Sequence, residues 1–272
     1  MTYTLITGSS SGIGRAIAFE CAGRGMHLLL IALDEPALHK VRTDLLEAYA
    51  IDVHCLGINL TDHEAPGQIY DWCQSNQFQV DTLINNAGIG NSGLFENNPL
   101  KDYIQMIRLN NQAVVGLTHY FLPDLKRQAS AYILNVSSME ATLPLPYKAV
   151  YTGTKNFIYA FSMAISEELK SSDVQVSVLC PGPVLTNPAG LQRIQSQGLS
   201  ARLLLMMPEE VARIAIRKML RGQRIIIPGK LPFLIVKFLN LLPEAIKMSI
   251  LERIFRVYRD LPGDSQGRLE EI

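Results

Sequence analysis

Short apolar runs alternate with longer amphipathic stretches along most of the chain. The apolar runs are expected to be strands and cover residues 3–7, 27–32, 53–58, 82–85, 132–136, 174–179 and 224–228. The stretches between them are expected to be helices and cover residues 12–24, 35–49, 62–76, 101–126, 151–169 and 208–220. Strands that are apolar on both faces and are separated by helices indicate a parallel sheet covered on both sides. The pattern therefore predicts a doubly wound α/β fold with a sheet of about seven strands.

The composition indicates a small-molecule substrate and excludes a strongly charged partner. The 272 residues include 25 basic and 25 acidic side chains, so no electrostatic field favours nucleic acid. Four cysteines are scattered without metal-binding spacing, as is typical of reduced thiols: Cys21, Cys55, Cys73 and Cys180. We find no signal-peptide pattern and no run of the roughly 20 apolar residues that a membrane span needs. We therefore expect a soluble, cytoplasmic protein.

The sequence TGSSSGIGRAIA, residues 7–18, places Gly8, Gly12 and Gly14 between the first expected strand and the first expected helix. Backbone N–H groups and a helix N-terminus at this point can receive a pyrophosphate, which a side chain would keep away. The spacing differs from the G-x-G-x-x-G fingerprint of dinucleotide-binding folds. A dinucleotide cradle and a simple tight connection both remain possible from this loop alone.

Four motifs in order resemble those of the short-chain dehydrogenase/reductase family. They are the glycine loop, NNAG at 85–88, NVSS at 135–138 followed by YTGTK at 151–155, and PGPVLT at 181–186. The resemblance runs from residue 7 to about residue 186 and implies a Rossmann-type fold in residues 1–229. It also implies an NAD(P)-dependent enzyme that interconverts a secondary alcohol and a carbonyl by hydride transfer. The alternative is a cofactor-binding regulator or scaffold that keeps the fold without turnover.

Tyr151 and Lys155 are the candidate acid/base pair. Their i, i+4 spacing puts them on one helix face, where the lysine is expected to lower the pKa of the phenol. The alternative is an ordinary pair on a solvated helix face. The resemblance implies that Ser138 orients the substrate oxygen, with Ser137 as the alternative. It also assigns a proton-relay role to Asn110, whose neighbour Asn111 is the weaker candidate.

The resemblance further implies contacts with NAD or NADP from several loops at one edge of the sheet. The expected cofactor-binding residues are Gly8, Ser9, Ser10, Ser11, Gly12, Ile13, Gly14, Leu33, Asp34, Asn59, Leu60, Asn86, Ala87, Gly88, Tyr151, Lys155, Pro181, Gly182, Val184 and Thr186.

The choice between NAD and NADP stays open. An acidic residue after the second strand can bind the ribose 2′-hydroxyl, whereas an arginine can accept a 2′-phosphate. Leu33 stands at the usual position and Asp34 follows one residue later. Asp34 is equally well explained as a helix cap before Pro36. Asn59 stands where the family commonly has an aspartate beside the adenine.

An apolar substrate, such as a steroid or a fatty-acyl compound, is suggested by the residues around the expected pocket. The segment 187–207 occupies the position of the family's substrate lid and ends in Leu203, Leu204, Leu205, Met206 and Met207. Burial within a helix is the simpler explanation of that apolar run. Residues 140–147 add apolar lining, and Glu140 puts a polar anchor near the pocket.

Residues 230–272 are expected to form an amphipathic helical extension of the same domain. Ile246, Ile250, Ile254, Tyr258 and Leu261 recur at helical spacing. The extension could pack on the body or on a second subunit, cover the substrate mouth, or attach peripherally to a membrane surface. Apolar residues on more than one face of the helices after Lys101 and from Tyr151 predict a homodimer or homotetramer, which the resemblance also implies.

Overall fold

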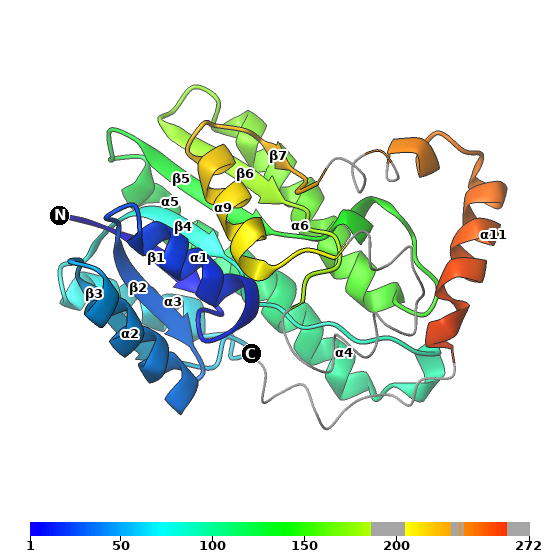
Figure 1. Ribbon diagram of the computed structural model, residues 1–272, viewed down its shortest axis with the longest axis horizontal. Helices are drawn as coiled ribbons and strands as arrows, with labels where there is room; N and C mark the ends of the chain where they lie inside the picture. Colours follow the sequence, from blue (N-terminus) through cyan, green and yellow to red (C-terminus); the bar gives the residue numbers. More distant parts are fainter. Residues whose placement is uncertain (186–204, 230–233, 235–236, 260–272) are drawn as a thin grey trace.

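The computed structural model describes residues 1–185, 205–229, 234 and 237–259 of the 272-residue chain, and its centre is a parallel sheet of seven strands (Figure 1). The strand order is β3-β2-β1-β4-β5-β6-β7, and each pairing is parallel. The strands are β1 (Thr2–Thr7), β2 (His27–Ala32), β3 (Val53–Gly57), β4 (Gln79–Asn85), β5 (Ala131–Val136), β6 (Val174–Leu179) and β7 (Ile225–Ile226). The direction of progression along the sheet reverses between β1 and β4. A crevice at the carboxyl ends of these two strands is where doubly wound folds bind ligands.

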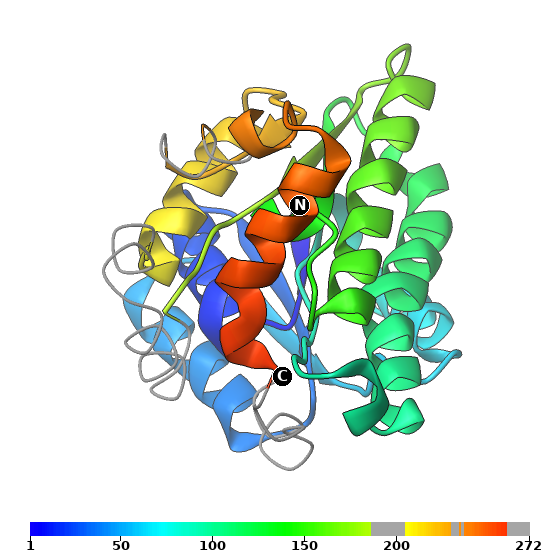
Figure 2. The same cartoon turned by 90° about the vertical axis from the view of Figure 1, so that its right-hand side faces the viewer.

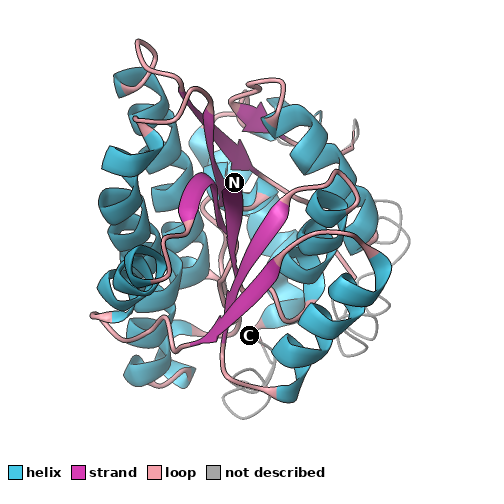
Figure 3. Cartoon of the chain, turned by 90° about the vertical axis from the view of Figure 1, so that its left-hand side faces the viewer, coloured by secondary structure: helices cyan, strands magenta, loops and turns pink. Residues whose placement is uncertain are grey.

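Helices cover both faces of the sheet (Figure 3). One face carries α1 (Gly12–Ala22), α2 (Pro36–Ala48) and α9 (Pro208–Met219), and the other carries α3 (Ala65–Ser75), α5 (Ala113–Leu125) and α6 (Ala149–Glu168). Both faces of the central strands are buried: Ile6 packs on the side of α1, and its neighbour Leu5 packs on the side of α5. The two apolar cores explain why the strands are apolar at nearly every position.

The expected helix over residues 101–126 is interrupted in its middle. It consists of α4 (Leu100–Ile107), the π-helical turn η2 (Arg108–Gln112) and α5. The interruption lies at Asn110, one of the candidate site residues. π-Turns inside helices occur frequently at functional sites, because the extra residue re-aims the side chains around it. The last expected strand is shorter than residues 224–228, since only Ile225 and Ile226 pair with β6.

The helix α11 (Glu244–Phe255) and the turn η4 (Arg256–Tyr258) lie at the end of the molecule towards which the strands point (Figure 1). Figure 2 looks onto this end and shows α11 running across it between α9 and α6. Leu251 is buried in a small third core that also contains Leu143, Leu145 and Leu239. This end of the chain therefore packs on the segment that leads into α6.

The expected apolar stripe of the C-terminal helix is only partly correct. Ile246 and Ile254 are exposed, whereas Lys247 and Leu251 are the buried residues of α11. The Lys247 ammonium is 2.8 Å from Glu244, which lets its aliphatic stem lie against the protein. The expected member Leu261 lies outside the described residues.

All four cysteines are free, and three of them are buried: Cys21, Cys73 and Cys180. Within the part of the chain that the structure describes, no helix is long and apolar enough to cross a membrane.

Candidate active site

The loop after β1 forms a narrow cradle at the start of α1. Gly8 has a φ of +63°, a conformation that L-residues with side chains rarely adopt. A Cβ on Gly14 would lie 2.0 Å from the Gly8 carbonyl oxygen. The Asn86 side-chain amide holds the loop by donating to the carbonyls of Thr7, at 2.9 Å, and Gly8, at 3.1 Å. Only glycine fits where the loop meets the helix.

The cradle suits a pyrophosphate. The first turn of α1 carries no acidic side chain, so the positive end of the helix dipole is not neutralised there. The loop residues Ser9 and Ser10 are buried, while Ser11, Gly12 and Ile13 lead into the helix. Thr7 fixes the neighbouring strand, because its hydroxyl accepts hydrogen bonds from the backbone N–H groups of Asn86 and Ala87. These contacts preorganise the loop for a dinucleotide.

Two glycines after β4 bring three of the candidate catalytic residues together. A Cβ on Gly88 would lie 3.1 Å from both the Asn110 Oδ1 and the Lys155 Nζ atoms. A Cβ on Gly90 would lie 2.8 Å from the ring of Tyr151. Asn110, Tyr151 and Lys155 come from η2 and α6, so the loop after β4 is the surface on which these two elements meet.

Asn110 ties its π-turn to that loop. Its side-chain amide donates to the Ile89 carbonyl at 2.9 Å and accepts from the Ile89 N–H at 2.9 Å. The amide also donates to the Thr154 hydroxyl on α6 at 3.0 Å. Asn111 makes one hydrogen bond, to the Thr154 carbonyl, and is less buried. Asn110 is thus the residue that links η2, α6 and the loop after β4.

The two serines after β5 have different surroundings. Ser137 donates to the backbone carbonyl of Lys155 at 2.7 Å, which occupies its hydroxyl in joining β5 to α6. Ser138 accepts from the Glu140 N–H at 3.1 Å, and its hydroxyl lies near enough to the Tyr151 phenol to oppose the rise in the pKa of that phenol. Of the two, Ser138 is the serine placed beside the phenol.

The electrostatics of Tyr151 differ from the expectation that Lys155 lowers its pKa. Burial, reinforced by the nearby Glu140 carboxylate, raises the pKa of Tyr151 to about 12. The neighbouring cation that opposes this rise is Lys148. Lys155 donates to the Val136 carbonyl at 3.0 Å, and burial lowers the pKa of its ammonium to about 8. The phenol is therefore protonated at neutral pH in this form of the protein.

The expectation that Asp34 could cap the following helix is wrong. Pro36 is the first helical residue, so the cap position falls on the residue directly before it, Glu35. Asp34 instead accepts a hydrogen bond from His39 Nε2 at 2.9 Å, and its side chain is 72% exposed. A Cβ on Gly57 would lie 2.3 Å from the Asp34 Cβ, so the end of β3 passes closely behind it. Asp34 thus presents its carboxylate to solvent beside the half-buried Leu33.

Asn59 and Leu60 follow β3 at the same edge of the sheet. The Asn59 side chain accepts from the N–H of Thr61 at 3.0 Å and from its hydroxyl at 2.8 Å, while Leu60 is buried. This local turn fixes the backbone where the resemblance implies an adenine contact.

The loop after β6 lies next to the candidate catalytic residues. The Pro181 carbonyl accepts from the Met139 N–H at 2.9 Å, and Gly182 follows it. Val184 bridges to Met206 in a parallel arrangement that closes the loop. Thr186, and the expected lid residues Leu203 and Leu204, lie outside the described residues.

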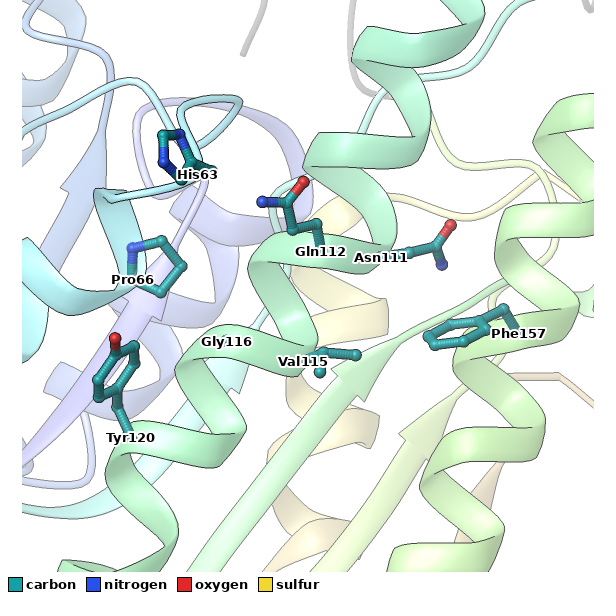
Figure 4. A pocket seen from close by; sticks show the side chains of 8 residues that line it. All are labelled: His63, Pro66, Asn111, Gln112, Val115, Gly116, Tyr120 and Phe157. Atoms are coloured by element: carbon teal, nitrogen blue, oxygen red, sulfur yellow. The ribbon is translucent and has the colours of Figure 1, made fainter.

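A separate pocket of about 400 Å³ opens on the outer surface of α5 and α6 (Figure 4). Val115 and Phe157 lie on its two helices, and His63 and Pro66 border it at the start of α3. Its lining includes the weaker candidate Asn111 but not Asn110, Ser138, Tyr151 or Lys155. This pocket is therefore distinct from the site at the carboxyl ends of the strands.

Three residues of the site were not expected from the sequence. Thr154 holds Asn110, Lys148 lies beside Tyr151, and Tyr258 of η4 reaches Lys148. The only available signal for the first two was their position within a few residues of Tyr151. Tyr258 had no such signal, because the contact depends on how α11 folds back.

The fold and the arrangement of Asn110, Ser138, Tyr151 and Lys155 define a nucleotide-dependent α/β protein with a polar site beside the glycine cradle. The family model described as short chain dehydrogenase matches residues 2–196, and the chain belongs to this family.

Two curated relatives illustrate the sequence similarity. The very-long-chain 3-oxoacyl-CoA reductase of Laccaria bicolor is 30% identical over 183 residues, which cover 65% of this chain and 53% of the relative. Human 17-beta-hydroxysteroid dehydrogenase type 3 is 32% identical over 190 residues, which cover 68% of this chain and 59% of the relative. The matched region thus spans between about half and three fifths of these relatives.

Solved structures match over nearly the whole chain. A 7beta-hydroxysteroid dehydrogenase has a TM-score of 0.84 at 21% identity and covers 92% of this chain and 96% of its own. A short-chain dehydrogenase from Sphingobium yanoikuyae, in complex with NADPH, has a TM-score of 0.74 at 25% identity and covers 90% and 98%. The sheet topology is therefore that of the family.

Proposed function

We propose that the chain is an NAD(P)-dependent oxidoreductase that interconverts a secondary alcohol and a carbonyl by hydride transfer. The observation that carries the proposal is the convergence of Asn110, Tyr151 and Lys155 on the loop after β4, with Ser138 beside the phenol. Membership of the short chain dehydrogenase family supports the same reaction.

Tyr151 is proposed as the general acid and base. Because the pKa of its phenol is raised to about 12 by burial, it carries a proton at neutral pH and can donate it to a carbonyl oxygen during reduction. In the opposite direction the phenolate accepts the proton of the alcohol. Ser138 orients and polarises the substrate oxygen, and Lys155 supplies positive charge on the same face of α6. Asn110 is proposed to serve the proton relay, and its hydrogen bonds to Ile89 fix it between η2 and the loop after β4.

NAD or NADP supplies or accepts the hydride when bound. The cradle of residues 8–14 suits its pyrophosphate, and Leu33, Asp34, Asn59 and Leu60 border the expected adenosine side. Asn86, Ala87, Gly88, Pro181, Gly182 and Val184 are proposed to line the remaining length. The choice between NAD and NADP stays open. The Asp34 carboxylate can accept a hydrogen bond from a ribose 2′-hydroxyl, but it is paired with His39, and both side chains are exposed to solvent.

The first test is a titration of the purified chain with NADPH and then NADH, followed by nicotinamide fluorescence. We expect at least one nucleotide to bind, and Tyr151→Phe to abolish turnover while leaving nucleotide affinity nearly unchanged. Binding without turnover on any carbonyl or alcohol substrate would favour the alternative of a non-catalytic regulator. Unchanged turnover in Tyr151→Phe would remove this residue from the mechanism.

An apolar substrate is proposed, of the steroid or fatty-acyl type. The named activities of the reductase and dehydrogenase relatives support it. Leu143 and Leu145, which were expected to line the pocket, are buried in the small core with Leu251. A panel of ketosteroids, 3-oxoacyl-CoA esters and short sugar ketones separates the possibilities. Faster reduction of the sugars than of the apolar ketones would contradict the proposal.

Assembly as a homodimer or homotetramer through α5 and α6 is also proposed. Val115, Tyr120 and Phe157 are between 38% and 44% exposed there, which is a large apolar area for a solvated surface.

A cytoplasmic location is proposed as well. Peripheral membrane contact through α11, where Ile246 and Ile254 are exposed, is the alternative. Fractionation of cells that express the chain separates the two. Recovery in the membrane pellet, released by a charge substitution at Ile254, would support the alternative.

A further inference from the structure

Glu140 and Lys148 form an ion pair beside Tyr151. Glu140 lies in the short helix η3 (Met139–Thr142), and Lys148 directly precedes α6. The Lys148 Nζ atom is 3.0 Å from Oε1 and 3.2 Å from Oε2 of Glu140. Only 15% of the lysine side chain and 21% of the glutamate side chain are exposed. Each charge of the pair is therefore only weakly screened by solvent from the groups beside it.

Aromatic rings surround the Lys148 ammonium on the other side. The ammonium is 4.6 Å from the ring centroid of Tyr258, 5.3 Å from that of Phe255 and 6.0 Å from that of Tyr151. Such distances give favourable cation–π contacts. Tyr258 and Phe255 stack on each other at 5.8 Å, so the C-terminal segment provides a two-ring platform for the ammonium.

A second contact fixes the same stretch of backbone. Tyr147 has a φ of +65°, and its hydroxyl donates to Glu252 of α11 at 3.0 Å. Glu252 in turn pairs with Arg256 at 2.7 Å. Lys148 is thus positioned by residues that lie about a hundred positions further along the chain.

Lys148 stays charged next to the phenol. Burial disfavours its charge, but Glu140 and the phenols of Tyr258 and Tyr151 outweigh burial and raise the pKa of Lys148 to about 12. For Tyr151 the two members of the pair act in opposite directions. Burial and the Glu140 carboxylate raise the pKa of the phenol, while Lys148 and the Ser138 hydroxyl oppose the rise.

The polar and charged groups around Tyr151 come from several elements, while the loop after β4 packs on its ring with Gly90. They are Ser138 at the end of β5, Glu140 in η3, Lys148 before α6, and Tyr258 in η4, with Lys155 one turn along α6. Within this set, Glu140 and Lys148 are the two charged groups that pair with each other.

We propose that Lys148 is a positioning residue for the reaction, and that its ion pair with Glu140 sets how readily the Tyr151 phenol ionises. The C-terminal segment contributes by holding the ammonium against Phe255 and Tyr258. This inference rests on the proposed role of Tyr151 as acid and base. The C-terminal segment thereby acquires a role in catalysis, because Phe255 and Tyr258 hold the ammonium that acts on Tyr151.

Opposite shifts in the two single variants are the signature of this arrangement. Glu140→Gln removes the carboxylate and leaves the ammonium, so the phenol ionises at lower pH. Lys148→Gln removes the ammonium and leaves the carboxylate, so ionisation moves to higher pH. A unit charge roughly 6 Å from a titrating group in a partly buried site shifts its pKa by about one to two units. The double variant is expected to return towards the wild-type value, as is Lys148→Arg, which keeps the charge.

The experiment measures Tyr151 directly as well as through turnover. Uniform 3-fluorotyrosine labelling gives a ¹⁹F signal for each tyrosine and lowers the phenol pKa, and Tyr151→Phe identifies the signal of residue 151. Titration of the wild type, the single variants and the double variant is compared with the pH dependence of kcat/KM. Circular dichroism checks that each variant keeps its fold.

Opposite shifts in the ¹⁹F titration support the proposal even if no substrate has been found. Shifts in the same direction, or none, would overturn it and leave only a structural role for the pair. Loss of turnover in Tyr151→Phe together with unshifted titrations would retain the proposed function and reject this inference alone. Turnover that survives in Tyr151→Phe would instead reject the proposed function.

Discussion

Asn110 and Ile89 exchange a pair of hydrogen bonds at 2.9 Å, with the side chain of one satisfying both backbone groups of the other. The relationship explains why the long helix contains a π-turn: the extra residue lets Asn110 face the loop after β4 and not the solvent. The Asn110 side-chain amide therefore gives the N–H and carbonyl of Ile89 the hydrogen bonds that a neighbouring strand would give them in a sheet.

Asn110→Ala should destabilise the protein and impair turnover, because it leaves the N–H and carbonyl of Ile89 without their partners. We expect a loss of about 1–3 kcal/mol in the free energy of unfolding, measured by urea denaturation. Asn111→Ala is the matched control in the same π-turn, since it removes one hydrogen bond from a less buried residue. Equal effects of the two substitutions would contradict the special position of Asn110.

Gly14→Ala should damage the cradle at its tightest point. The added Cβ would lie 2.0 Å from the Gly8 carbonyl oxygen, so the backbone of the loop has to move. We expect a cost of about 1–3 kcal/mol in stability and at least tenfold weaker NADPH or NADH binding, followed by fluorescence titration.

The control for that substitution lies at the other end of the same helix. A Cβ on Gly23 would meet the Phe19 carbonyl oxygen at 3.4 Å, which is an ordinary contact, and Gly23 has a right-handed φ of −63°. Gly23→Ala should therefore bind nucleotide like the wild type. If Gly14→Ala also binds normally, the cradle is not where the pyrophosphate sits.

Lys155 should make the stability of the nucleotide-free protein depend on pH. Burial lowers the pKa of its ammonium from the ordinary 10.5 to about 8. Below pH 8 both the folded and the unfolded chain hold the proton, and the folded chain bears the cost of a buried charge. Between pH 8 and 10.5 the unfolded chain holds more protons, so stability rises with pH through this window.

The free energy of unfolding of the wild type minus that of Lys155→Met should rise by up to about 3 kcal/mol across that window. Denaturation at a series of pH values measures it. Lys40→Met serves as the comparison, because it removes a lysine whose side chain is 74% exposed. A flat difference for Lys155→Met would show that the ammonium is not buried at a cost in solution.

The local pattern was enough to predict the sheet, the glycine loop and the face shared by Tyr151 and Lys155. These features depend on residues that are close in sequence or on strands that are apolar throughout. The π-turn could not be predicted, because it depends on the tertiary hydrogen bonds between Asn110 and Ile89. The pKa of Tyr151 was expected to fall because Lys155 stands one helical turn away, whereas burial and the Glu140 carboxylate raise it.

Contacts from distant segments explain the remaining differences. The spacing of Glu140 and Lys148 in the sequence does not reveal an ion pair, and Tyr258 reaches Lys148 only because α11 folds across this end of the molecule. The apolar stripe of α11 was misassigned for a related reason. Its buried face is decided by the small core around Leu143 and Leu145, and not by the periodicity of its isoleucines.

Phe157→Asp should reduce the size of the proposed oligomer. Phe157 lines the pocket between α5 and α6, stacks on Phe161 at 6.0 Å, and is 44% exposed. A carboxylate placed in a dimer interface at this point would be buried without a partner, which costs several kcal/mol and is sufficient to separate the subunits at micromolar concentration. Sedimentation velocity measures the change. Leu46→Asp provides the comparison, because Leu46 is 41% exposed on α2 and lies outside the proposed interface. A lower mass for Phe157→Asp alone supports assembly through α5 and α6, and an unchanged oligomer would place the interface elsewhere.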